Sequence, residues 1–241
     1  MSMWGPNMND RPYPLDYAAG TRDIAVIHFF NAVYAWMAVG LAVTASVAWL
    51  VFSRHNAMAA VLTPGAIFGI FILQLILVVA ISAAVRRISA PVATALFVAY
   101  AALNGLLFSS LFYLYTVTSI AGTFGACAAM FAVMSLYGMF TKTDLTTMGK
   151  ILFMALIGLI VASVINMFVA SSGLYWLVSY AGVIIFAGLT AYDTQRLGAI
   201  AASTQGDAAL AARLSVSGAL MLYLDFINMF LFLLRFMGKK R

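Results

Sequence analysis

The stretch Ala191-Tyr192-Asp193-Thr194-Gln195-Arg196 closes an apolar run that begins at Leu174, and Tyr223-Leu224-Asp225-Phe226-Ile227-Asn228 lies inside the last apolar run of the chain. Each stretch places one aspartate in a segment that is otherwise suited to lipid. A carboxylate at the middle of a membrane helix costs roughly 2.5 to 3.5 kcal/mol on insertion scales. Two such residues therefore point to a function rather than to passive decoration.

The composition is that of an integral membrane protein. Of 241 residues, 65% are apolar and only 8% are charged, and the mean hydropathy is +1.04, whereas an ordinary soluble domain is about half apolar and a quarter charged. The net charge of +6 arises from basic residues in the short segments that flank the apolar runs, where such residues set topology and meet anionic lipid. We therefore expect the lipid bilayer, and not nucleic acid, to be the partner of this charge.

Seven apolar runs are long enough to cross a membrane as helices. Each has close to the roughly 20 residues that a helix needs to cross 30 Å of hydrocarbon. The alternating ten-residue pattern of a membrane barrel does not occur. The predicted fold is an all-α integral membrane protein with a single domain over 24–241, preceded by a short, loosely ordered polar tail over 1–23. The runs cover residues 27–51, 65–85, 92–115, 119–140, 150–171, 174–195 and 214–237.

Two local features of these runs carry structural expectations. The only longer polar connection is predicted over 196–213, between the sixth and seventh runs. Small residues four positions apart are expected to let helices approach closely. These pairs are Gly65/Gly69, Gly158/Ala162 and Ala187/Ala191.

The distribution of Lys and Arg predicts the orientation. With the N-terminus inside, the inner segments hold eight basic residues: Arg11, Arg22, Arg86, Arg87, Lys142, Lys150, Arg196 and Arg213. The outer segments then hold Arg54 and, if the last run crosses fully, Arg235, Lys239, Lys240 and Arg241. A re-entrant last run would bring this C-terminal cluster inside, but it would have to bury non-helical backbone, and 214–237 contains no Pro. We predict seven full spans with the C-terminus outside, and leave the re-entrant alternative open.

Several stretches resemble the bacterial branch of the transmembrane Bax inhibitor motif family. They are Phe29-Phe30-Asn31-Ala32-Val33-Tyr34, Gly188-Leu189-Thr190-Ala191-Tyr192-Asp193-Thr194-Gln195, Leu222-Tyr223-Leu224-Asp225-Phe226-Ile227-Asn228 and Leu234-Arg235. The resemblance covers most of residues 24–237, and its two Asp motifs are the most specific parts. It implies a seven-helix bundle in the bacterial inner membrane, with the last helix enclosed by the other six and the two aspartates facing each other near the cytoplasmic side.

The same resemblance implies a function. Members are associated with a pH-sensitive calcium leak, and others with stress protection and with modulating a membrane-bound ATP-dependent protease. The family also has an arginine at the end of the second helix as a partner of the carboxylates. Arg86 is the nearest fit in this chain, although Arg87 is adjacent.

The chemistry of an aspartate pair supports this expectation independently. Asp193 and Asp225 are 32 positions apart in the chain, so only the fold can bring them together. Two carboxylates in a poorly hydrated site cannot both ionise cheaply, so they share a proton and titrate as a coupled pair. When deprotonated they are hard oxygen ligands of the type that calcium prefers. We predict that Asp193 and Asp225 sense protons and bind calcium transiently, with Arg86 as their counter-charge.

Three alternatives remain. Each aspartate could be satisfied locally, by Arg196 or by Asn228, which lie three positions later on the same helical face. The protein could bind and modulate a membrane protease without moving ions. It could also be an intramembrane aspartyl protease, but Leu222-Tyr223-Leu224 stands where that class has Gly-x-Gly. Because no glycine-rich phosphate loop, metal-ligand spacing or nucleophile triad occurs, we expect no enzyme activity and no cofactor, with calcium only as the transported ion.

Overall fold

The fold is known from a computed structural model, which describes residues 15–54, 59–61, 63–84, 87–204 and 207–241. The helices are α1 (Leu15–Phe52), α3 (Pro64–Ala84), α4 (Ala90–Phe108), α5 (Leu111–Leu114), α6 (Val117–Phe140), α7 (Thr146–Val169), α8 (Ser172–Ser203) and α9 (Ala208–Met237). With α4 and the short α5 taken together, they provide 7 segments long and apolar enough to cross a membrane. The predicted all-α, seven-span membrane fold is confirmed.

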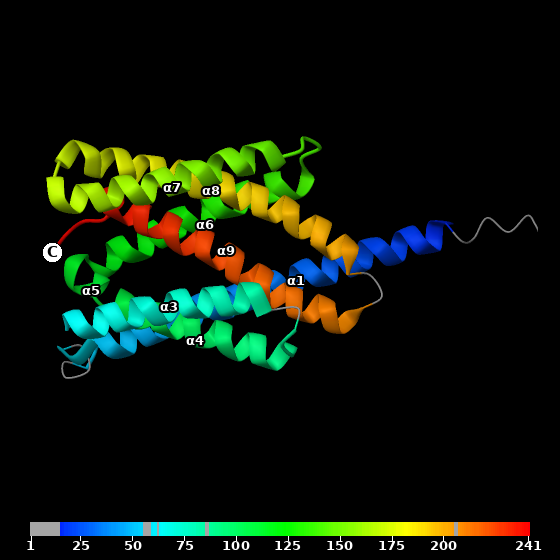
Figure 1. The fold of residues 1–241 in the computed structure, drawn as a ribbon, viewed down its shortest axis with the longest axis horizontal. Helices are drawn as coiled ribbons and strands as arrows, with labels where there is room; N and C mark the ends of the chain where they lie inside the picture. Colours follow the sequence, from blue (N-terminus) through cyan, green and yellow to red (C-terminus); the bar gives the residue numbers. More distant parts are fainter. Residues whose placement is uncertain (1–14, 55–58, 62, 85–86, 205–206) are drawn as a thin grey trace, which may run out of the picture.

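The helices form two groups of three with α9 between them (Figure 1). In one group α4 packs against both α1 and α3, and in the other α8 packs against both α6 and α7. The central helix α9 packs directly against α1, α4, α6 and α8. The last helix is therefore enclosed as predicted, with α3 and α7 in outer positions of their groups.

Helix α9 runs through the bundle from one end to the other (Figure 1). Its C-terminal extension pairs with the segment between α5 and α6, where the Thr116 amide donates to the Lys239 carbonyl oxygen (3.2 Å) and the Arg241 amide to that of Leu114 (3.1 Å). The Lys239 amide also donates to Ser119 Oγ (2.8 Å). A continuous helix that ends in this way is not re-entrant, so the re-entrant alternative is wrong.

Buried side-chain hydrogen bonds hold α9 at a fixed depth. Tyr223 is completely buried, and its hydroxyl lies 2.6 Å from Thr44 Oγ1 on α1. Thr44 Oγ1 also lies 2.9 Å from the carbonyl oxygen of Ala101 on α4, to which it can donate. Tyr223 is thus linked to α1 directly and to α4 through Thr44. These contacts fix the depth within the bundle of Asp225, which lies half a helical turn further along α9.

Two connections differ from the sequence prediction. The polar piece predicted over 196–213 is mostly helix, because α8 continues to Ser203 and α9 begins at Ala208. The segment is rich in alanine, the strongest helix former, and Asp207 caps α9 by accepting a hydrogen bond from the Leu210 amide (2.8 Å). At the N-terminus, α1 already begins at Leu15, so the second part of the predicted loose tail is helical. The first 14 residues lie outside the described part of the chain.

The small-residue pairs have different environments. Ala191 is completely buried where α8 crosses α6, and a Cβ on Gly138 of α6 would lie only 2.9 Å from the Ala191 carbonyl carbon. Close helix approach is therefore confirmed for Ala191. For Gly65, Gly69 and Gly158 the expectation was wrong, because an added Cβ would meet no atom within 4 Å.

Candidate ion and proton site

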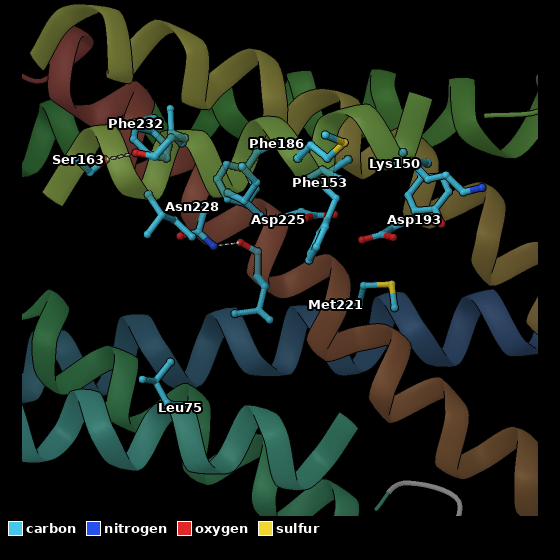
Figure 2. Close-up of a pocket in the computed structure, with 18 of the residues that line it drawn as sticks. Leu75, Lys150, Phe153, Ser163, Phe186, Asp193, Met221, Asp225, Asn228 and Phe232 are labelled. Carbon is cyan, nitrogen blue, oxygen red and sulfur yellow. Dashed lines mark hydrogen bonds between the residues drawn. The ribbon is translucent and has the colours of Figure 1, made fainter. Parts of the chain in front are cut away.

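The two predicted aspartates meet between α8 and α9. Asp193 and Asp225 lie within side-chain hydrogen-bonding range of each other, and their carboxyl groups point toward one another in Figure 2. A protonated carboxyl on one residue can therefore donate to the carboxylate of the other. The fold brings together two residues from opposite sides of the α8–α9 connection.

The pair is poorly hydrated. Asp225 is only 5% exposed, and within the described part of the chain its Oδ2 atom has no hydrogen-bond partner. Asp193 is half-buried. Two ionised carboxylates about 4 Å apart repel by roughly 4 kcal/mol at an effective dielectric constant of 20. The arrangement is therefore suited to holding one proton, or to attracting a cation when that proton leaves.

The residues that follow Asp193 fix its position. Thr194 Oγ1 lies 3.1 Å from Ser135 Oγ on α6, and Ser135 Oγ is also hydrogen-bonded to the Tyr34 hydroxyl of α1. Gln195 accepts from the Leu145 amide (2.9 Å) and donates to the Thr143 carbonyl oxygen (2.8 Å), which ties α8 to the connection between α6 and α7. Sequence reasoning did not assign these roles, although Thr194 and Gln195 belong to the motif.

A cavity of about 1140 Å³ adjoins the pair. It lies between α3, α7, α8 and α9, and Figure 2 shows Leu75 on the α3 wall facing the cavity from the side opposite α7. Most of its lining is apolar, and the polar and charged lining residues are Lys150, Ser163, Asp193, Arg196, Asp225 and Asn228. Sequence reasoning identified the aspartates but not the cavity or the place of Lys150 in it, because the cavity walls come from four helices whose packing the sequence pattern does not define.

The alternative that each aspartate is satisfied by a neighbour on its own helix holds only in part. Arg196 interacts electrostatically with Asp193, as that alternative expected. Asn228, however, donates from Nδ2 to the Leu224 carbonyl oxygen (2.8 Å) and does not clamp Asp225. Asp193 also lies well inside α8, which continues for ten residues to Ser203. The contact between the two carboxyl groups is thus the feature that local satisfaction does not explain.

Arg86, the predicted counter-charge, lies outside the described residues. The adjacent Arg87 is exposed in the connection between α3 and α4. The assignment of Arg86 stays a prediction.

A resident metal site needs more ligands than the pair supplies. Within the described residues, no group of three or more His, Cys, Asp or Glu side chains is placed to hold a metal ion. Calcium takes six to eight oxygen ligands in a stable protein site. The two carboxylates alone therefore supply too few ligands for a resident calcium ion.

Comparison with known proteins gives a consistent result. The family model described as "Inhibitor of apoptosis-promoting Bax1" matches residues 26–241. The chain is 49% identical over 215 residues to the inner membrane protein YbhL of Escherichia coli strain K12, covering 88% of this chain and 92% of the relative. It is 45% identical to an uncharacterized protein of Borreliella burgdorferi over 88% of this chain and 92% of the relative. A third relative, an uncharacterized protein of Deinococcus radiodurans, is 46% identical over 86% of this chain and 88% of its own length.

Proposed function

Because the chain belongs to the Bax inhibitor family of multi-pass membrane proteins, we propose that it is a pH-sensitive leak pathway for calcium, controlled by Asp193 and Asp225. The proposal rests mainly on one observation. Two carboxyl groups from different helices lie within hydrogen-bonding range, and one of them has a buried oxygen with no hydrogen-bond partner among the residues that the structure describes. Intramembrane acids of this kind mark ion and proton paths. Since the E. coli relative is named an inner membrane protein, we propose the same location for this chain.

The mechanism follows from the charge on the pair. With one shared proton, a carboxyl O–H donates to the facing carboxylate, and this charge-assisted bond holds α8 and α9 together. Loss of the proton leaves two like charges whose repulsion, roughly 4 kcal/mol at about 4 Å, exceeds the cost of a modest helix displacement. The pair then separates or recruits a cation. The groups around it are Arg196 on α8 and Lys150 on α7, which line the same cavity.

Calcium flux through purified protein in liposomes tests the proposal. We expect the flux to vary with pH near neutrality, and we expect Asp193→Asn, Asp225→Asn and the double variant to flatten that dependence, because an amide supplies no titrating charge. Asp144→Asn is the matched control. Asp144 lies in the connection before α7, where a hydrogen bond from Thr146 holds the pKa of its carboxyl below the usual value, so its charge does not change near pH 7.

Two results would contradict the proposal. One is a pH-dependent flux that the double Asn variant retains in full. The other is the absence of calcium flux at every pH from protein whose cooperative thermal unfolding proves that it is folded. The second result would favour the remaining role, that of a membrane protein that modulates a membrane-bound ATP-dependent protease without moving ions.

A further inference from the structure

The cavity beside the aspartates opens sideways into the region occupied by lipid. Its two outer walls are α3 and α7, which belong to different three-helix groups (Figure 1). The wall residues Phe71 and Leu75 on α3 and Ile160 on α7 are all apolar and exposed. An apolar recess does not hold water well, and in a bilayer the nearest apolar material is an acyl chain. The lateral part of this cavity is therefore a groove for hydrocarbon.

One end of the groove carries positive charge. Lys150, in the second turn of α7, and Arg196 on α8 are exposed and line the cavity, and Lys150 lies at the Asp193 end of the site in Figure 2. Each cation also has an acidic neighbour, since Arg196 interacts electrostatically with Asp193 and Lys150 with Asp144. Both basic side chains are nevertheless exposed at the cavity mouth. A headgroup phosphate is complementary to two exposed cations that flank an apolar groove.

The orientation predicted from the positive-inside pattern puts this mouth at the cytoplasmic interface, because Lys150 and Arg196 belong to the predicted inner segments together with Arg87, Lys142 and Arg213. Headgroups of the inner leaflet lie at that level. Beyond the mouth the α7 wall continues through Phe153, Leu156 and Ile160. The ten steps of helix from Lys150 to Ile160, at about 1.5 Å each, extend about 15 Å. This is half of a roughly 30 Å hydrocarbon core and so the depth that one acyl chain occupies.

We propose that the groove between α3 and α7 binds an anionic phospholipid of the inner leaflet. Its phosphate lies against Lys150 and Arg196, and one acyl chain lies along α7 toward Ile160. A chain in this position covers the aspartate pair from the membrane side. The site is independent of whether calcium passes through the protein, because it uses the charge and shape of the groove only.

Lipid binding to delipidated protein in detergent tests the headgroup part. Native mass spectrometry compares dioleoyl phosphatidylglycerol with dioleoyl phosphatidylcholine, which has the same acyl chains. We expect wild-type protein to bind phosphatidylglycerol about tenfold tighter or more, and Lys150→Gln/Arg196→Gln to remove that preference. The matched control is Arg87→Gln/Lys142→Gln, which removes two exposed cations that do not line the cavity and should keep the preference.

A second pair of variants tests the acyl-chain part. Ile160 lines the groove and is 55% exposed, whereas its neighbour Val161 is 52% exposed but does not line it. Ile160→Trp should weaken phosphatidylglycerol binding severalfold, and Val161→Trp should not. Glycerol phosphate, which has the anionic group without the chains, should not compete with the lipid.

The proposal is overturned if the two lipids bind equally, if the Lys150/Arg196 variant keeps the preference, if both Trp variants bind alike, or if glycerol phosphate competes. Thermal unfolding of each variant in the same detergent establishes that it is folded. Since every measurement is made without calcium, failure here leaves the proposed leak function intact, and failure of the flux experiment leaves this site intact.

Discussion

Helices α7 and α9 are both long enough to span a bilayer, yet they occupy opposite environments. In the most apolar window of α9, 67% of the residues are buried inside the protein, against 6% for α7. The α7 window is nevertheless more apolar than the α9 window. The relation between hydropathy and burial is thus the reverse of that in a soluble protein. In a bilayer the solvent is hydrocarbon, so the helix that carries polar groups is the one that the protein has to enclose.

This difference explains where chemistry can reside in the bundle. An acid on α7 would face acyl chains, whereas Asp225 on α9 faces Asp193 on α8, the helix with the second most buried window (50%). The hydroxyl contacts of Thr44, Tyr223, Ser135 and Thr194 also join α9 or α8 to α1 and α6. The side-chain contacts between spans are concentrated on the central helices, and the outer helices supply an apolar cover with a lateral opening between α3 and α7.

Glycine substitutions should give the largest contrast between core and outer helices. Gly138 on α6 contacts the backbone of Ala191 on α8, and backbone cannot move aside as a flexible side chain does. We expect Gly138→Leu to destabilise the protein by about 3 kcal/mol or more, or to prevent folding, because overpacking at a backbone contact forces the helices apart. Thermal unfolding of purified protein and the yield of folded protein measure the effect.

The control for this change is Gly158→Leu on α7. An added Cβ at Gly158 meets no atom within 4 Å, so the new side chain enters lipid, and Leu is also a better helix former than Gly. We expect unchanged or slightly increased stability. Equal loss of stability from both substitutions would show that α7 has a packing partner that the single chain lacks, and the contrast between the two regions would fail.

A hydroxyl deletion should give a smaller effect of the same kind. Tyr223→Phe removes the contact of the fully buried phenol with Thr44 Oγ1. Hydrogen bonds between membrane helices average about 0.6 kcal/mol and reach about 1.7 kcal/mol, so we expect a loss of stability in that range. A double-mutant cycle with Thr44→Val should recover the same coupling energy. Tyr180→Phe, at an exposed position of α8, should change the unfolding free energy little, and an effect as large as that of Tyr223→Phe would contradict the comparison.

Particular residues show what the sequence could and could not predict. The seven spans follow from apolar length, and Asp193 and Asp225 stand out because carboxylates are costly in lipid. The prediction of close helix packing was wrong for Gly65, Gly69 and Gly158 because small residues suit both close packing and lipid-facing surfaces. Spacing alone does not separate a packed glycine such as Gly138 from an exposed one such as Gly158. The predicted connection over 196–213 is mostly helix because low hydropathy indicates where a helix leaves the bilayer and not where the helix ends. The cavity and Lys150 were not predicted, since they depend on four helices whose arrangement only the fold defines.

The smallest expected effect distinguishes an acid outside the spans from the acids inside them. Asp144 Oδ1 accepts a hydrogen bond from the Thr146 amide (2.9 Å) at the start of α7, and hydrogen bonds from Thr146 keep the pKa of this exposed carboxyl below its usual value. A carboxyl whose pKa is lower in the folded state stabilises that state above its unfolded pKa, about 3.9 for Asp, and the contribution disappears as the pH falls through the folded value. Asp144→Ala should therefore lower the unfolding temperature slightly at pH 7, and the difference between variant and wild type should shrink as the pH falls below about 4.

Because this pH window lies well below neutrality, Asp144→Ala should leave the pH midpoint of calcium flux where it is. A pH dependence flattened by Asp144→Ala as much as by Asp193→Asn would mean that the titrating charge lies in the α6–α7 connection and not between the central helices.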